Sequence, residues 1–143
     1  MIRFSKMADY GVLLLGHFVL NPGEFSSAAD LSEAFHMPRS VVANLLKAFR
    51  EAGLLTSKRG LRGGYQLARP AEDISLLEVL KIVDGPVRLI DCAVVDLTDV
   101  CDYEDVCTSR HPMQAVNQRI VDMLDGMSLA ETIATNEPIS SDP

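Results

Sequence analysis

Several features that define whole classes of protein are missing from this sequence of 143 residues. Tryptophan is absent, no segment repeats, and the longest apolar stretch, Gly11 to Leu20, is too short to cross a lipid bilayer. That stretch also lacks the small-residue cleavage site of a secretory signal peptide. We therefore expect a cytoplasmic protein in which these residues form a helix that is buried on most of its circumference.

The sequence motifs of common enzymes are missing as well. The chain has no phosphate-binding glycine loop, no Gly-x-Ser-x-Gly turn and no His-Glu-x-x-His helix. His17 lies in the apolar stretch, where a core or interface histidine is the ordinary interpretation. His36 precedes Pro38 in a predicted turn, where a phosphate contact is possible but a plain turn role is more common. We expect a binding protein rather than an enzyme.

Cysteine is scarce, and its three copies are clustered. Cys92, Cys101 and Cys107 fall within sixteen residues, with His111 four positions after the last. An odd, clustered set does not fit a secreted disulfide framework, and gaps of eight and five residues do not give the paired knuckles of a usual zinc site. Thiolates at irregular spacing are typical of iron–sulfur clusters, although the spacing alone equally allows three unrelated cysteines.

Positive charge is also scarce, but it is concentrated in one segment. The net charge is −7, yet residues 36–69 carry seven Lys and Arg against a single acid, Glu51. Residues 70–143, by contrast, carry fifteen acids and four bases. A basic module of this kind can meet phosphate while the acidic remainder discourages loose binding. Double-stranded DNA is therefore the expected partner.

The predicted elements of residues 1–84 follow the order of a winged helix-turn-helix, and the fold class is mostly α with a small β-hairpin wing. Apolar periodicity and capping residues predict three helices, a hairpin and a fourth helix at residues 5–20, 27–35, 38–52, 54–67 and 75–84. Pro38 is expected in the first turn of the third helix, and Gly53 is expected to end it. Ser75 and Glu78 are expected to form a capping box.

The remaining residues divide into three further parts. Residues 85–111 form a long acidic loop that holds every cysteine, and residues 135–143 are expected to be a disordered tail. Residues 112–134 are expected to form a long helix, 112–125, and a short C-terminal helix. The long helix carries an apolar stripe at Val116, Ile120 and Leu124, which predicts a partner and hence a homodimer.

The DNA-reading residues are expected on the third helix and the hairpin. The exposed N-terminal half of that helix offers base-contacting side chains, namely Arg39, Ser40 and Asn44. Lys47 is better placed for phosphate. The hairpin adds cations and glycines that allow close approach to the backbone or minor groove, namely Lys58, Arg59, Arg62, Gly63 and Gly64. Either element alone could equally be an ordinary solvent-exposed surface. A basic helix followed by a basic hairpin, in this order, favours DNA binding.

These motifs resemble the Rrf-type winged-helix transcription regulators, the family that includes IscR and NsrR, over about residues 1–134. The wing signature is the most specific part, Arg59-Gly60-x-x-Gly63-Gly64-Tyr65-x-Leu67. The N-terminus with Asp9-Tyr10 and the cysteine trio are also similar, although the first cysteine gap is longer than in IscR-like members. Ala68-Arg69-Pro70 and Ile74-Ser75 look most like regulators of the SUF iron–sulfur assembly system.

The resemblance implies a homodimer joined by the long helix and a repressor of iron–sulfur assembly genes. It implies a cluster, 2Fe–2S in preference to 4Fe–4S, held by the three cysteines near the partner's first helix. Asp9 and His111 are the candidate fourth ligands. Asp9 sits at the edge of an apolar helix, where an unpaired carboxylate is costly, but a salt bridge to Arg3 or Lys6 is the alternative.

Other functions remain open at this stage. The same scaffold also fits a nitric-oxide or redox sensor. A DNA-binding protein whose thiols hold zinc or form a disulfide is a further alternative. A winged-helix module that binds only proteins is disfavoured by the arginines of the predicted wing.

Overall fold

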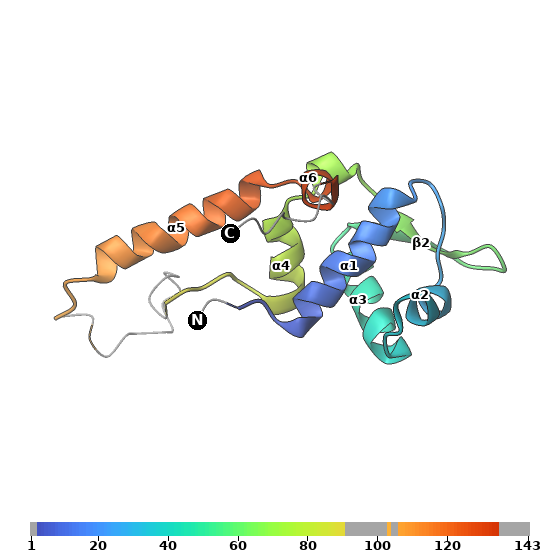
Figure 1. Cartoon of the computed structure of the whole chain (residues 1–143), viewed down its shortest axis with the longest axis horizontal. Coiled ribbons are helices and arrows are strands. Elements are labelled where there is room, and N and C mark those ends of the chain that lie inside the picture. The colour runs from blue at the N-terminus through green and yellow to red at the C-terminus, as the bar shows by residue number, and fades with distance from the viewer. Residues whose placement is uncertain (1–2, 91–102, 104–105, 135–143) are drawn as a thin grey trace, which may run out of the picture.

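The computed structural model describes residues 3–90, 103 and 106–134, and it is mostly helical with one small hairpin (Figure 1). The elements in chain order are α1 (Lys6–Leu20), α2 (Ala28–Phe35), α3 (Arg39–Glu51), β1 (Leu55–Lys58), β2 (Gly64–Leu67), the 3₁₀ turn η1 (Ala71–Asp73), α4 (Leu76–Asp84), α5 (Arg110–Gly126) and α6 (Leu129–Ala134). The predicted fold class is confirmed. The predicted tail, 135–143, lies outside the described residues.

The helix ends follow the capping residues closely. Ser27 and Asp30 form the capping box of α2, and hydrogen bonds from the Ser27 side chain and backbone hold the pKa of Asp30 below its usual value. Ser75 caps α4, but the carboxylate of Glu78 does not complete the box, because it binds Arg69 instead. Pro38 is the N-cap of α3 rather than a residue of its first turn, so that prediction was one position out.

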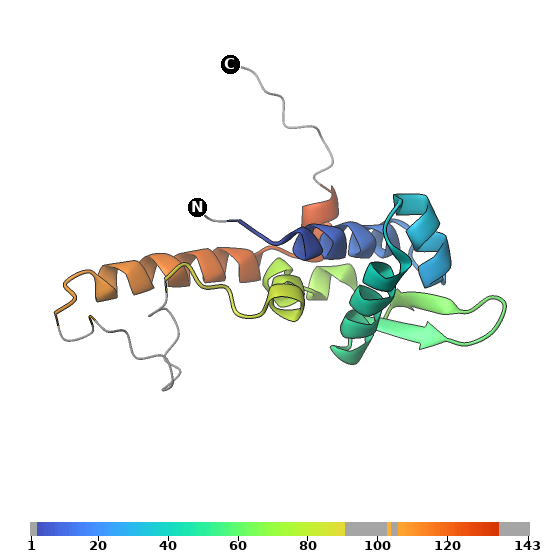
Figure 2. The same ribbon diagram turned by 90° about the horizontal axis from the view of Figure 1, so that it is seen from below.

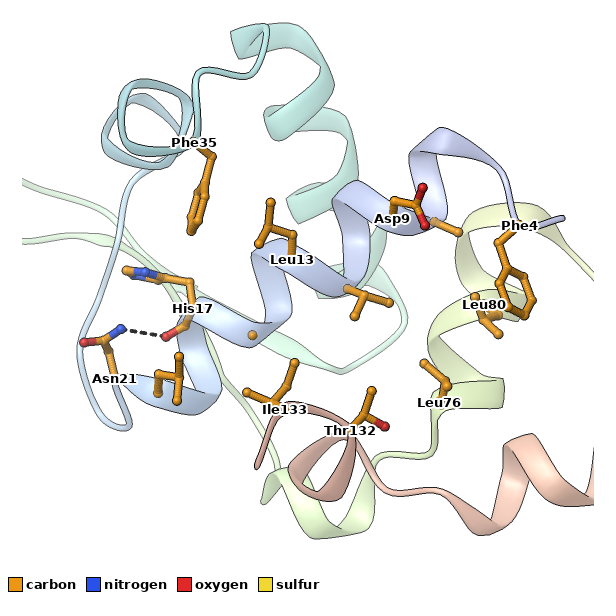
Figure 3. A pocket seen from close by; sticks show the side chains of 14 residues that line it. Phe4, Asp9, Leu13, His17, Asn21, Phe35, Leu76, Leu80, Thr132 and Ile133 are labelled. Atoms are coloured by element: carbon orange, nitrogen blue, oxygen red, sulfur yellow. Dashed lines mark hydrogen bonds between the residues drawn. The ribbon is translucent and has the colours of Figure 1, made fainter. Parts of the chain in front are cut away.

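The prediction that α1 is buried on most of its circumference is wrong for one face. Leu13 is 47% exposed and Leu20 is 64% exposed. Both line a groove of about 510 Å³ whose other walls come from α2, α4 and α6 (Figure 3). The groove walls include Phe35, Leu76 and Ile133. The apolar residues of α1 therefore form two surfaces: one packs in the core, and the other lines the groove.

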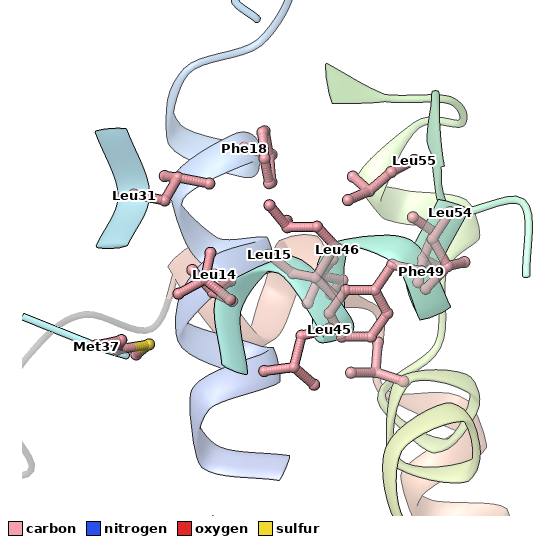
Figure 4. Close-up of a cluster of buried hydrophobic side chains, with 14 residues drawn as sticks. Leu14, Leu15, Phe18, Leu31, Met37, Leu45, Leu46, Phe49, Leu54 and Leu55 are labelled. Carbon is pink, nitrogen blue, oxygen red and sulfur yellow. The ribbon is translucent and has the colours of Figure 1, made fainter. Parts of the chain in front are cut away.

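The opposite face of α1 builds that core together with α3 (Figure 4). Phe18 of α1 and Phe49 of α3 are each at most 1% exposed, and burying such a side chain contributes about 1.5–3 kcal/mol. A Cβ on Gly11 would lie 3.0 Å from the Phe49 ring, so a glycine here permits close packing of the two helices. The other buried members are Leu14, Leu15, Leu31, Met37, Val42, Leu45, Leu46, Leu54, Leu55, Ile74, Val79 and Leu129.

The hairpin that follows α3 is antiparallel, with Leu55 opposite Leu67 and Lys58 opposite Gly64. Its second strand gains a further neighbour from the loop between α1 and α2, because Ser26 pairs with Tyr65. Gly64 has φ +134°, and a Cβ there would lie 2.5 Å from the Ser26 carbonyl atoms. Glycine at this position is thus required by the contact between the wing and the helical body.

Helix α5 projects away from the winged-helix body in both views (Figures 1 and 2). It begins at Arg110, two residues before the predicted start, so His111 lies within its first turn. The expectation that its whole apolar stripe needs a partner chain was wrong. Leu124 is buried and Ile120 is half-buried against α4 of the same chain, which leaves Val116, at 45% exposed, as the open member.

The short helix α6 returns the chain to the winged-helix core. Ser75 and Ser128 form an isolated bridge, and the Leu129 amide donates to the Ile74 carbonyl at 2.7 Å. Leu129 is fully buried in the same cluster as Leu14, and a Cβ on Gly16 would lie 3.0 Å from Ile133. No helix among the residues described here is long and apolar enough to cross a membrane.

Gly64→Ala should lower the free energy of unfolding by about 2 kcal/mol or more, because it combines positive-φ strain with a backbone collision. Gly60→Ala is the matched control, since Gly60 has φ +115° but nothing within 4 Å of a built Cβ. It should cost about 1 kcal/mol. Urea unfolding of the two variants measures the difference, and equal costs would contradict the predicted collision with Ser26.

Candidate functional site

The polar face of α3 is fully presented to solvent. Arg39, Ser40, Asn44 and Lys47 are all exposed, while the apolar stripe on the opposite side of the helix is buried. Lys47 lies 3.8 Å from Glu51, but such an exposed i,i+4 pair contributes only about 0.3–0.5 kcal/mol. Lys47 can therefore exchange this partner for a phosphate at little cost.

The turn before α3 is fixed by a small hydrogen-bonded unit that sequence reasoning did not identify. The Ser32 hydroxyl donates to the Met37 carbonyl at 2.6 Å, and the Met37 amide donates to the Ser32 carbonyl at 3.1 Å. Met37 is buried, and His36 adopts a left-handed conformation with φ 53°. This unit sets the direction of α3 relative to α2, and the side chain of His36 stays exposed.

The wing carries the second group of predicted DNA contacts. Lys58, Arg59 and Arg62 are exposed, and the Lys58 ammonium lies 5.9 Å from the centre of the Phe25 ring. A Cβ on Gly63 would lie 2.1 Å from the Lys58 carbonyl oxygen, so the turn itself excludes larger residues there. The wing's own fold thus explains Gly63 and Gly64, and their approach to DNA stays a prediction.

Arg69 does not belong to the exposed basic surface, although it lies in the basic segment of the sequence. Its Nη2 donates to Glu78 Oε1 at 2.6 Å, and both side chains are little more than a third exposed. This pair ties the end of β2 to α4. Its sequence separation of nine residues falls outside any helix or strand periodicity, so no local pattern could reveal it.

The candidate cluster ligands are described only in part. Cys92 and Cys101 lie outside the described residues, whereas Cys107 is a free, exposed thiol three residues before α5. Asp9 and His111 are exposed as well. Within residues 3–90, 103 and 106–134, no group of three or more His, Cys, Asp or Glu residues is arranged to hold a metal ion. The exposed sulfur of Cys107 is nonetheless the type of donor that holds an iron–sulfur cluster.

The argument from the cost of burying Asp9 was wrong, because its side chain is exposed at the rim of the groove. The alternative prediction, a salt bridge from Asp9 to Arg3 or Lys6, was wrong too, since none of the ion pairs among the described residues joins them. Lys6 instead lies 5.4 Å from the Tyr10 ring centre, and its hydrogen bond with the Tyr10 hydroxyl raises its pKa.

The start of α5 lies at the end of the molecule opposite the wing, well away from α1 (Figures 1 and 2). Asp9 and His111 of one chain therefore do not lie in the same site. Asn117 anchors the approach to the cysteine segment: it is 6% exposed, and its Oδ1 accepts from the Leu89 amide at 2.9 Å. No local sequence pattern could identify this role, because the partner Leu89 lies 28 positions away.

Comparisons with known proteins agree with this architecture. CymR of B. subtilis, described as its global cysteine regulator, has a TM-score of 0.72 at 19% identity, with 94% of this chain and 98% of that chain covered. T. potens IscR has a TM-score of 0.72 at 22% identity, with coverages of 99% and 93%. Staphylococcus aureus CymR has a TM-score of 0.70 at 24% identity, with coverages of 94% and 100%. At these identities the likeness is one of fold.

The sequence comparison goes further than the fold. The family profile described as "Rrf2: Iron-dependent Transcriptional regulator" matches residues 4–135, which is nearly the whole chain. Members of this family are DNA-binding transcription regulators rather than enzymes. The chain therefore belongs to the Rrf2 family of transcriptional regulators.

Proposed function

We propose that this Rrf2 protein is a homodimeric repressor of iron–sulfur assembly genes that senses its signal through an iron–sulfur cluster. The observation that carries the DNA-binding part is the exposed polar row of α3 beside an exposed basic wing in an otherwise acidic chain. A helix of this kind fits the major groove, and a wing reaches the neighbouring backbone. Arg39, Ser40 and Asn44 read base edges, whereas Lys47, Lys58, Arg59 and Arg62 neutralise phosphates.

Cys92, Cys101 and Cys107 are the proposed cluster ligands. The description of the family as iron-dependent, together with the exposed Cys107 thiol, supports this assignment. When bound, a 2Fe–2S or 4Fe–4S cluster supplies a site that changes with iron supply, oxidants or nitric oxide. The protein's part is to hold that site at the N-terminus of α5, and α4 connects α5 to the DNA-binding elements.

The second protomer is proposed to pack along α5. This helix leaves apolar side chains exposed on its projecting part, namely Met113, Val116 and Met123. Exposed apolar side chains along one helix are commonly covered by a partner. Since Asp9 and His111 lie apart within one chain, Asp9 serves as a fourth ligand only if the partner's first helix supplies it.

The division of labour at DNA can be tested by titration against specific and random duplexes. Arg59→Ala and Arg62→Ala should weaken binding to both duplexes and reduce the salt slope by about 1 each, because phosphate contacts are lost. Asn44→Ala should cost about 1–3 kcal/mol on the specific duplex only. Lys81→Ala, which removes an exposed charge from α4, is the control and should change neither the affinity for the two duplexes nor the salt slope. If Asn44→Ala weakened binding to the random duplex as much as to the specific one, as Arg59→Ala should, this assignment would be refuted.

The cluster itself is tested by purification without oxygen. The wild-type protein should be brown, with visible absorption and about stoichiometric iron and sulfide, because three thiolates supply most of the ligands of one cluster. Changing each of Cys92, Cys101 and Cys107 to Ser should remove most of that absorption. Colourless wild-type protein that contains zinc, or that contains only a disulfide, would favour the zinc or thiol-switch alternative and reject the cluster.

The fourth ligand is tested with Asp9→Ala and His111→Ala, each compared with a control that removes an exposed residue of the same type, Glu33→Ala and His36→Ala. We expect Asp9→Ala to alter the visible spectrum and shorten the cluster's lifetime in air, because a weak oxygen ligand leaves one iron open to exchange. The two controls should match the wild type. A changed spectrum for His111→Ala with an unchanged one for Asp9→Ala would reverse the assignment.

A further inference from the structure

The wing has a third hydrogen-bonded segment, which comes from the loop between α1 and α2. Ser26 exchanges two main-chain hydrogen bonds with Tyr65 of β2, each 2.9 Å long. Strand β2 therefore lies between β1 and Ser26, although Ser26 is a single residue rather than a strand. An isolated two-stranded hairpin is marginal in water, so this added pairing bears directly on how firmly the wing is held.

A side-chain hydrogen bond in turn holds Ser26 to α1. His17 Nε2 lies 2.9 Å from Ser26 Oγ, and the two residues are nine positions apart. The imidazole makes edge-on contacts with the rings of Phe18 and Phe35, at centroid distances of 5.4 and 6.0 Å. Figure 3 shows the Phe35 ring beside His17. A ring held from two sides presents its nitrogen at a defined position, so it can fix the serine in turn.

The helix end does not depend on that ring. Asn21 closes α1 by donating its backbone amide and its side-chain Nδ2 to the His17 carbonyl, at 3.0 and 2.8 Å. The backbone of His17 thus serves the helix end, whereas its side chain serves the wing. This separation allows the two roles to be tested independently.

We propose that His17 and Ser26 are positioning residues for DNA binding, which fix the wing at one angle to α3. The base of the hairpin is tied to the end of α3, where the Ala68 amide donates to the Leu54 carbonyl at 2.9 Å. The Arg69–Glu78 pair and the burial of Leu55 hold the same end of the hairpin. The Ser26–Tyr65 pairing adds the main-chain contact on the outer edge of β2, nearer the tip. With these contacts in place, Arg59 and Arg62 reach phosphate while α3 lies in the groove. The inference rests on the proposed DNA contacts of the wing.

Two substitutions of His17 separate the contribution of its aromatic contacts from that of its hydrogen bond to Ser26. His17→Phe keeps an aromatic ring for Phe18 and Phe35 but removes the bond to Ser26. His17→Gln loses the ring, but its amide occupies nearly the position of Nε2 and can restore the bond. Ser26→Ala removes the hydroxyl from the other side, and Asn21→Ala is the control that weakens the same helix end without touching the Ser26–Tyr65 pairing.

The first measurement is amide hydrogen exchange at Tyr65 in the DNA-free protein. His17→Phe and Ser26→Ala should accelerate exchange about three- to tenfold, the effect of losing one neutral, partly buried hydrogen bond. His17→Gln should stay near the wild-type rate. Asn21→Ala should lower the melting temperature and leave the Tyr65 rate unchanged. Unchanged exchange in both His17→Phe and Ser26→Ala would overturn the inference.

The second measurement is DNA affinity, made in the wild-type wing and in an Arg59→Ala/Arg62→Ala wing. His17→Phe and Ser26→Ala should weaken binding about three- to tenfold in the first background and leave it unchanged in the second, because the phosphate contacts that they position are already absent. Equal weakening in both backgrounds would mean that the residues act through general stability, and the inference would be wrong.

The two measurements also separate this inference from the proposed function. Faster Tyr65 exchange in His17→Phe, combined with wild-type DNA affinity of the Arg59→Ala/Arg62→Ala protein, would refute the wing's phosphate contacts and support the anchoring of the wing. Unchanged exchange combined with weak DNA binding of the double variant would support the contacts and refute the anchoring.

Discussion

Helix α1 packs against α3 through the close approach of Gly11 to Phe49, and most of the other elements lie against one of these two helices. Helix α2 and β1 lie against α3, while α4 and α6 lie against α1. A Cβ at position 11 would lie 3.0 Å from the Phe49 ring, so a larger residue there would require this buried side chain of α3 to shift. The geometry of the DNA-binding face is therefore a property of the core rather than of the surface that carries it.

The buried stripe of α3 has a direct consequence for function. Since its apolar residues are fixed against α1, the helix has only one rotation about its own axis, and that rotation presents Arg39, Ser40 and Asn44 to solvent. The wing is oriented differently, through Ser26 and through the Arg69–Glu78 pair at its end. One of the two proposed DNA-contacting elements is thus set by hydrophobic packing, whereas the other adds hydrogen bonds and an ion pair to the burial of Leu55.

Local patterns predicted the parts of the fold that depend on local chemistry. The N-cap at Ser75 and the apolar stripe of α3 were visible because their residues lie within about two helical turns of each other. The exposed face of α1 could not be predicted, since hydropathy does not say which surface an apolar residue meets. The Ser26–Tyr65 pairing and the Asn117–Leu89 bond join residues 39 and 28 positions apart, so only the folded chain brings them together.

The burial of Leu129 among the residues of α1 and α3 has a consequence for the order in which the protein is made. A ribosome synthesises the proposed DNA-contacting segment first, but the core beneath that segment stays incomplete until α6 has been added. The long helix α5 is synthesised before α6 and is already present at that moment. A chain consequently cannot complete the core beneath α3 before it also carries α5, the helix proposed to recruit the second protomer.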